Sequence, residues 1–165
     1  MAFSNRSILV ACARAAMVVV ACCNLGAGPF TSGKINYVAE LFTSQGCSSC
    51  PRADQWLAAV ARAPDVVAVS FAVDYWDYIG WRDTLASPAF TARQKAYAAA
   101  QGERNVYTPQ VIVNGLAGAA GGDSAEIEQA IKATKGLDGA LSVPMRLAGT
   151  SGDFSVEVAE GGGGP

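Results

Sequence analysis

Two cysteines separated by two residues, Cys47-Ser-Ser-Cys50, constrain this chain more than any other feature of its sequence. They lie between an apolar run with strand character, Ile35–Phe42, and a run with helical spacing that begins at Pro51. Amide groups at a helix start stabilise negative charge, so Cys47 can be a thiolate nearer neutral pH than a free thiol, whose pKa is about 8.5. Cys50, one turn later, is close enough to close a disulfide or resolve a mixed one. The motif therefore predicts a dithiol at a strand-to-helix junction.

Three other interpretations of the pair stay open: a structural disulfide, a metal half-site, and a vestigial pair on an inactive scaffold. A structural zinc site needs four ligands, typically Cys and His. The chain contains no His, and its other three cysteines lie in an N-terminal segment that we expect to be removed, at Cys12, Cys22 and Cys23. Zinc is therefore not expected, whereas a two-thiolate Cu(I) site stays an alternative. No organic cofactor is implied.

The first thirty residues have the pattern of an export signal. Arg6 and Arg14 precede a short apolar run, Ala15–Cys23, and small residues follow it. This order is typical of a secretory signal peptide, which we predict over residues 1–27. The run is far shorter than the ~18–20 residues that span a bilayer, so no membrane span is expected. The alternatives are a short buried N-terminal helix and a lipid anchor at Cys22.

An exported chain works in an oxidising compartment, which favours disulfides. Once the predicted signal peptide is removed, only Cys47 and Cys50 remain, and they can pair with each other. The net charge is −2 at pH 7 and there is no basic cluster, so the chain lacks the electrostatic footprint of a nucleic-acid-binding protein. We expect a periplasmic or secreted protein that carries a Cys47–Cys50 disulfide and does not bind nucleic acid.

Residues 35–134 alternate between strand-like and helix-like segments. Ser87-Pro88 is a strong helix start, and Asn114-Gly115 predicts a tight hairpin turn. We expect strands over 35–42, 66–73, 110–113 and 116–119, and helices over 52–62, 88–101 and 124–134. The order β-α-β-α-β-β-α is that of the thioredoxin fold, an α/β fold whose central mixed sheet is flanked by helices. We predict this domain over residues 33–136.

Residues 137–165 depart from this alternation. Leu141–Leu147 and Phe154–Val158 predict two strands around a turn at 149–153, before a glycine-rich end. A sheet of two strands leaves unprotected edges. We therefore expect this segment to be a small, truncated β appendage.

Thr108-Pro109 stands at the start of the third predicted strand. A proline cannot donate to a strand ladder, so this position requires an edge or a special geometry. In a thioredoxin fold it holds a cis proline packed against the dithiol, and the preceding residue offers its backbone to an extended substrate chain. We therefore predict a cis peptide bond and a substrate-binding role for both residues. The alternative is a trans proline that opens an edge strand.

Glu40 lies in the first predicted strand, on one face with Val38 and Phe42. An ionised carboxylate without a partner in a buried strand is costly. Glu40 could therefore accept or return the proton of a buried Cys50 as the disulfide opens and closes. The alternative is a structural carboxylate bonded to a backbone turn or to Lys34.

The segment Asp74-Tyr-Trp-Asp-Tyr-Ile-Gly-Trp-Arg-Asp83 follows the second predicted strand. Ligands of open α/β sheets bind outside the carboxyl ends of the strands, where Cys47 is also expected. Aromatic side chains there, Tyr75 and Trp76 above all, could form a groove for a substrate chain. The alternative is a packed lid that buries these rings against the helices.

Together these motifs give the chain a close resemblance to a known family over about residues 35–160. It resembles the secreted bacterial family catalogued as domain of unknown function 1223, within the thioredoxin-like superfamily. The resemblance implies a thioredoxin-like domain with a signal peptide and a following β region, and it supplies no activity. It is carried by four segments in register, Glu40–Pro51, Val73–Trp81, Ala86–Phe90 and Val106–Gly115.

More distantly, Cys47, Cys50 and Pro109 match the nucleophile, the resolving thiol and the cis proline of thioredoxins. Two departures matter. Glu40 lies seven residues before Cys47, one more than the buried acid of thioredoxins, and the Ser-Ser pair between the thiols differs from that of well-known reductants and oxidants. The sequence thus favours an exported thiol–disulfide oxidoreductase acting on protein thiols or disulfides. It leaves open whether the protein oxidises or reduces its substrates. The alternatives are a non-catalytic binding module with a structural disulfide and a Cu(I)-binding dithiol protein.

Overall fold

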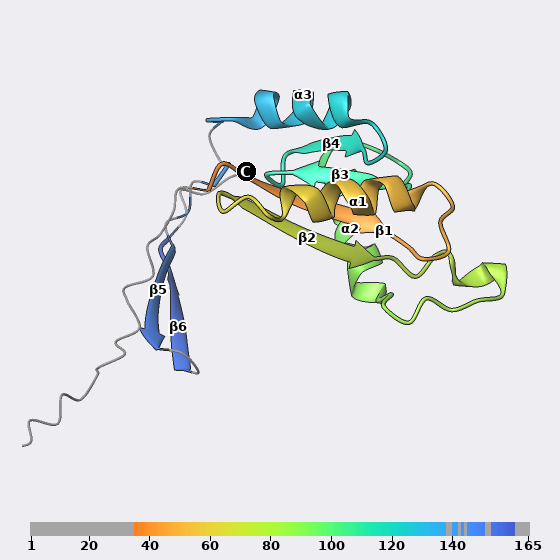
Figure 1. The fold of residues 1–165 in the computed structure, drawn as a ribbon, viewed down its shortest axis with the longest axis horizontal. Coiled ribbons are helices and arrows are strands. Elements are labelled where there is room, and N and C mark those ends of the chain that lie inside the picture. Colours follow the sequence, from red (N-terminus) through yellow and green to blue (C-terminus); the bar gives the residue numbers. More distant parts are fainter. Residues whose placement is uncertain (1–34, 138–139, 142, 144, 151–152, 161–165) are drawn as a thin grey trace, which may run out of the picture.

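A computed structural model describes residues 35–137, 140–141, 143, 145–150 and 153–160. The predicted signal peptide lies outside these residues. The described chain forms one four-stranded sheet with helices on both faces, followed by a separate two-stranded sheet (Figure 1). In the described residues, no helix is both long enough and apolar enough to cross a membrane.

The four-stranded sheet has the order β2-β1-β3-β4. Its strands are β1 (Tyr37–Thr43), β2 (Val66–Ala72), β3 (Gln110–Val113) and β4 (Ala117–Ala120). β1 runs parallel to β2 and antiparallel to β3, and β3 runs antiparallel to β4. β1 and β3 are the central strands and are almost wholly buried, in keeping with their mostly apolar sequences. The sheet and its flanking helices form the predicted thioredoxin-like α/β fold.

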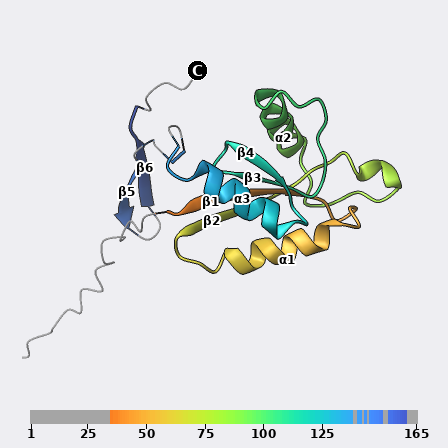
Figure 2. The ribbon, with the colours of Figure 1, turned by 90° about the horizontal axis from the view of Figure 1, so that it is seen from above.

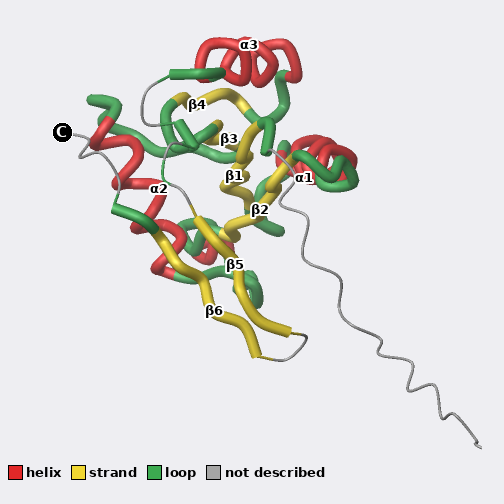
Figure 3. Tube along the Cα trace, turned by 90° about the vertical axis from the view of Figure 1, so that its left-hand side faces the viewer, coloured by secondary structure: helices red, strands yellow, loops and turns green. Residues whose placement is uncertain are grey.

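Three helices cover the sheet, α1 (Cys50–Val60), α2 (Pro88–Ala100) and α3 (Ser124–Thr134). α1 and α3 lie on one face and α2 on the other, which is clearest in the end-on view (Figures 2 and 3). Strand alternation explains the division. Ala39 and Leu41 of β1 pack with α1 and α3, whereas Phe42 packs with Tyr97 of α2.

Local sequence signals set several of these boundaries. Ser87 accepts a hydrogen bond from the Ala89 N–H at 3.3 Å and caps α2, as predicted. Asp123 caps α3 in the same way, one residue before the predicted start. Asn114 and Gly115 both have positive φ, at 54° and 73°, which confirms the predicted hairpin turn between β3 and β4.

The C-terminal hairpin corrects one prediction. Its strands are β5 (Met145–Thr150) and β6 (Asp153–Val158), so β5 begins four residues later than the predicted Leu141. Leu141 has φ 53°, a left-handed conformation that a strand residue does not adopt. Leu141 therefore lies in a turn before β5, and the hairpin register pairs Met145 with Val158.

Candidate functional site

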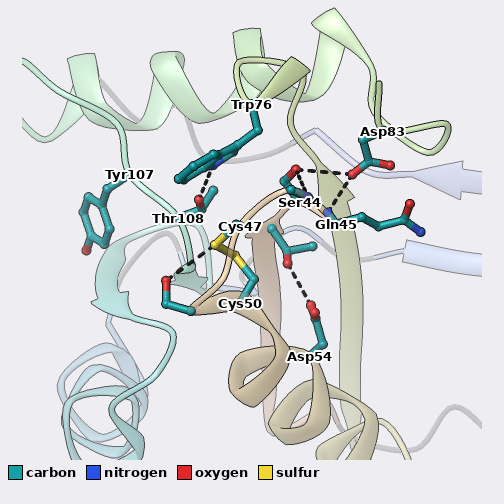
Figure 4. The surroundings of a disulfide bond; sticks show 12 residues. Ser44, Gln45, Cys47, Cys50, Asp54, Trp76, Asp83, Tyr107 and Thr108 are labelled. Atoms are coloured by element: carbon teal, nitrogen blue, oxygen red, sulfur yellow. Dashed lines mark hydrogen bonds between the residues drawn. A yellow bond between two sulfur atoms is a disulfide. The ribbon is translucent and has the colours of Figure 1, made fainter. Parts of the chain in front are cut away.

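Cys47 and Cys50 form a disulfide, with an S–S distance of 2.09 Å and Cα atoms 5.4 Å apart (Figure 4). Cys50 is the first residue of α1, and its N–H donates to the Cys47 carbonyl at 3.2 Å. Both residues are buried, with 2% of Cys47 and none of Cys50 exposed to solvent. The predicted pair is therefore joined, and both of its residues are almost closed to solvent.

The chain reaches this position through a tight turn between β1 and α1. The Cys47 N–H donates to the Ser44 carbonyl at 3.1 Å. Pro51 occupies the first turn of α1, where a missing N–H costs no helical hydrogen bond. The Thr43 hydroxyl donates to the Asp54 carboxylate at 2.8 Å and joins the end of β1 to the first turns of α1. The dithiol thus lies at the junction between β1 and α1.

The peptide bond between Thr108 and Pro109 is cis, as predicted from its place before β3. Pro109 and Ala53 of α1 both pack against Gly121. A Cβ atom placed on Gly121 would come 2.8 Å from Pro109 Cβ and 3.1 Å from Ala53 Cβ, so these three residues meet closely. The loop that carries Thr108 and Pro109 is thereby placed next to the helix that carries Cys50, and Figure 4 shows Thr108 beside the disulfide.

Both members of the aromatic pair predicted to bind substrate lie near Thr108. Trp76 reaches the site, where its indole Nε1 donates to Thr108 Oγ1 at 2.7 Å. Tyr75 donates its hydroxyl to Gln94 Oε1 of α2 at 3.2 Å. Burial raises the pKa of Tyr75, and hydrogen bonding to Thr108 and Gln94 partly opposes this rise. The structure therefore brings both aromatic side chains to Thr108.

Two buried polar residues, to which the sequence assigned no role at the dithiol, connect the loops of the site. Gln94 donates to the Tyr107 carbonyl at 2.7 Å and to Gln110 Oε1 at 2.8 Å, on either side of Thr108-Pro109. Asp83 accepts from the Gln45 N–H at 2.8 Å and so joins the 74–83 segment to the dithiol turn. Neither contact has a local signal in the sequence, because each joins segments far apart along the chain.

Glu40 lies on the α2 face of the sheet, whereas Cys50 belongs to α1 on the opposite face. Arg93 donates two hydrogen bonds to the Glu40 carboxylate, from Nε to Oε2 at 2.6 Å and from Nη2 to Oε1 at 2.8 Å. Tyr97 donates its hydroxyl to Oε1 at 2.8 Å. Burial first, and then this bond to Glu40, raises the pKa of Tyr97 to about 12.

These contacts separate Glu40 from the dithiol and do not favour the predicted proton relay to Cys50. They fit the alternative of a structural carboxylate that has partners. The partner is Arg93 of α2, while the Lys34 considered from the sequence lies outside the described residues.

A groove of about 400 Å³ lies between α1 and β2, beside the dithiol turn. Its lining combines the carboxylates of Asp54 and Asp83 with small or apolar side chains such as Leu57, Ala68 and Ser70. Across the residues that the structure describes, no group of three or more His, Cys, Asp or Glu side chains is placed to hold a metal ion. The two-thiolate Cu(I) alternative remains a prediction.

Comparison with known proteins gives one family and one solved structure. The model of the family described as "Protein of unknown function (DUF1223)" matches residues 38–163. The X-ray crystal structure of protein AGR_C_4864 from Agrobacterium tumefaciens is 41% identical in sequence, with a TM-score of 0.70. The match covers 79% of this chain and 59% of that one, so this chain spans little more than half of that protein's length. None of the curated proteins matches the chain.

Proposed function

This chain belongs to DUF1223, a family of proteins of unknown function, and we propose that it is an exported thiol–disulfide oxidoreductase acting on protein thiols or disulfides. The observation that carries the proposal is the Cys47–Cys50 disulfide at the start of α1, with the loop of Thr108 and the cis Pro109 beside it. A dithiol at a helix start is a favourable place for a thiolate, and the adjacent loop offers backbone groups to an extended substrate.

The proposed reaction is a two-step exchange. A substrate thiolate attacks the Cys47 sulfur, a mixed disulfide forms, and Cys50 leaves as a thiolate that takes up a proton. A second substrate thiolate then attacks the substrate sulfur of the mixed disulfide and releases Cys47. In sum, one protein disulfide and two substrate thiols become two protein thiols and one substrate disulfide, so the substrate loses two electrons. The same steps in reverse reduce a substrate disulfide.

Cys47 is assigned as the sulfur that exchanges with the substrate, attacked in the oxidising direction and attacking in the reverse one, because Cys50 is fully buried within the first turn of α1. Thr108 would hold the substrate backbone next to Cys47, in keeping with its position in Figure 4. Glu40 has no part in the proposed exchange, because the sheet lies between its carboxylate and α1.

One observation favours a second candidate, a binding module whose disulfide is structural. Cys47 is only 2% exposed, and sulfur exchange requires access. In that case the 74–83 segment, which carries exposed apolar side chains at Tyr78 and Ile79, would contact a partner.

Turnover and trapping separate the two candidates. We expect the protein to reduce insulin or refold a scrambled disulfide protein, and the Cys47→Ser variant to lose this activity. Cys50→Ser should accumulate mixed disulfides through Cys47, while Cys47→Ser accumulates fewer through Cys50. Equal trapping by both variants would remove the assigned roles, and absence of turnover in the unaltered protein would favour the structural disulfide.

A further inference from the structure

The burial of Cys47 raises the question of what controls access to its sulfur. The segment 74–86 between β2 and α2, here called the lid, contains the short 3₁₀ helix η1 (Asp77–Ile79). Figure 4 shows Trp76 of the lid and Thr108 close to the disulfide, on the side away from α1. The lid therefore stands where a substrate that engages Thr108 would arrive.

The lid is attached to the dithiol turn itself. The buried Asp83 carboxylate accepts from the Gln45 N–H at 2.8 Å and from the Ser44 hydroxyl at 3.4 Å. The lid also packs directly on Gly46. A Cβ at that position would lie 3.1 Å from Ile79 Cδ1 and 3.3 Å from Trp76 Cβ, so little space remains between the lid and the residue before Cys47.

At its other side the lid meets the loop of Thr108 and Pro109, here called the proline loop. The Trp76 Nε1 donates to Thr108 Oγ1 at 2.7 Å, and the Tyr75 side chain also interacts with Thr108. The Trp76 bond joins the lid to the residue that the proposed function assigns to substrate binding. A polypeptide that binds along Thr108 would meet the indole first. A small thiol makes no comparable contact with Thr108, so its binding does not displace the Trp76 indole.

We propose that Trp76 is a specificity-determining residue, whose hydrogen bond to Thr108 restricts the Cys47 sulfur to polypeptide partners that displace the indole. The inference rests on the proposed function for the assignment of Cys47 as the attacked sulfur. Its consequence is kinetic. Small thiols such as glutathione should reduce the disulfide slowly, and a cysteine-containing peptide should reduce it faster at equal thiolate concentration.

Two conservative variants remove the bond from opposite ends. Trp76→Phe keeps an aromatic ring but loses the N–H donor. Thr108→Val keeps the branched shape but loses the acceptor and, with it, the interaction with Tyr75. Trp81→Phe is the matched control, because Trp81 belongs to the same lid and is 48% exposed. The measurement is the rate constant for reduction of the Cys47–Cys50 disulfide by glutathione and by the peptide, followed by alkylation of the released thiols and mass spectrometry.

Because one hydrogen bond changes an equilibrium by up to about tenfold, we expect glutathione rates to rise about 3- to 10-fold in both variants. The peptide-to-glutathione rate ratio should fall, and Trp81→Phe should match the unaltered protein. An unchanged glutathione rate in Thr108→Val, or an equal rise of that rate in Trp81→Phe, would overturn the inference. If Trp76→Phe does not fold, the glutathione rate of Thr108→Val decides the test. If the unaltered protein shows no turnover but the variants still react faster with glutathione, the proposed function alone is refuted. If the protein turns over but the variants react with glutathione at the unaltered rate, the inference alone is refuted.

Discussion

Arg93 of α2 and Glu40 of β1 form a bidentate ion pair, with Nε–Oε2 and Nη2–Oε1 distances of 2.6 and 2.8 Å. The residues are 53 positions apart, and the pair joins the only helix on its face of the described four-stranded sheet to a central strand. The Glu40 side chain is 7% exposed and that of Arg93 is 48% exposed. The pair therefore has one buried member that depends on its partner.

Replacement of Arg93 by Met should destabilise the fold. Loss of one partner of a buried pair costs about 3–5 kcal/mol, and because Arg93 is half exposed we expect about 2 kcal/mol here. Urea unfolding at pH 7 measures the change. Lys95→Met, on an exposed position of the same helix, is the control and should change stability by less than about 0.5 kcal/mol. Equal effects of the two substitutions would contradict a specific role for the pair.

Glu40→Gln tests the assignment of Glu40 as a structural residue. The substitution weakens the bonds to Arg93 and Tyr97 and should lower the free energy of unfolding. The rate of reduction of the Cys47–Cys50 disulfide and its dependence on pH should stay within about twofold, since the sheet separates Glu40 from α1. A displaced pH–rate profile in this variant would instead favour the proton relay.

Tyr97 makes stability depend on pH in the alkaline range. Its pKa rises from 10.0 to about 12 in the folded protein, so the folded state holds the phenol proton more tightly than the unfolded state does. The resulting stabilisation is complete below pH 10 and is lost as the pH rises from about 10 to 12. Tyr97→Phe should therefore flatten the fall of unfolding free energy between these values. The slope measured by urea unfolding at several pH values would be unchanged if Tyr97 did not contribute.

Two adjacent glycines give a matched test of the packing around Pro109. A Cβ on Gly121 would lie 2.8 Å from Pro109 Cβ and 3.2 Å from the Pro109 carbonyl carbon, whereas one on Gly122 would meet nothing within 4 Å. Gly121→Ala should cost about 1–3 kcal/mol of stability, because the proline loop must move. Gly122→Ala should be nearly neutral. Similar melting temperatures for the two variants would show that the contact is not tight.

The sequence predicts the parts of this fold that depend on local physics. The order of strands and helices follows from hydrophobic spacing, and the Ser87 cap and the Asn114-Gly115 turn follow from local backbone preferences. The placement of Cys47 and Thr108 at one end of the sheet follows from topology. These predictions need no knowledge of which side chains meet.

The remaining features depend on long-range geometry. The sequence leaves Glu40 open between a proton relay to Cys50 and a structural carboxylate, and the phase of β1 turns it toward Arg93 on the face opposite α1. The path of the lid is likewise fixed by the bond between Asp83 and the Gln45 N–H, which joins residues 38 positions apart. Sequence spacing within one segment does not report such contacts, so the burial of Cys47 was not foreseen.

The midpoint reduction potential of the Cys47–Cys50 pair, measured in glutathione redox buffers, tests the central claim most directly. Thiol–disulfide exchange proteins have potentials between about −120 and −270 mV, whereas structural disulfides lie below about −300 mV. The proposed function predicts a value in the first range. A value below about −300 mV would contradict it and would mark the disulfide as structural.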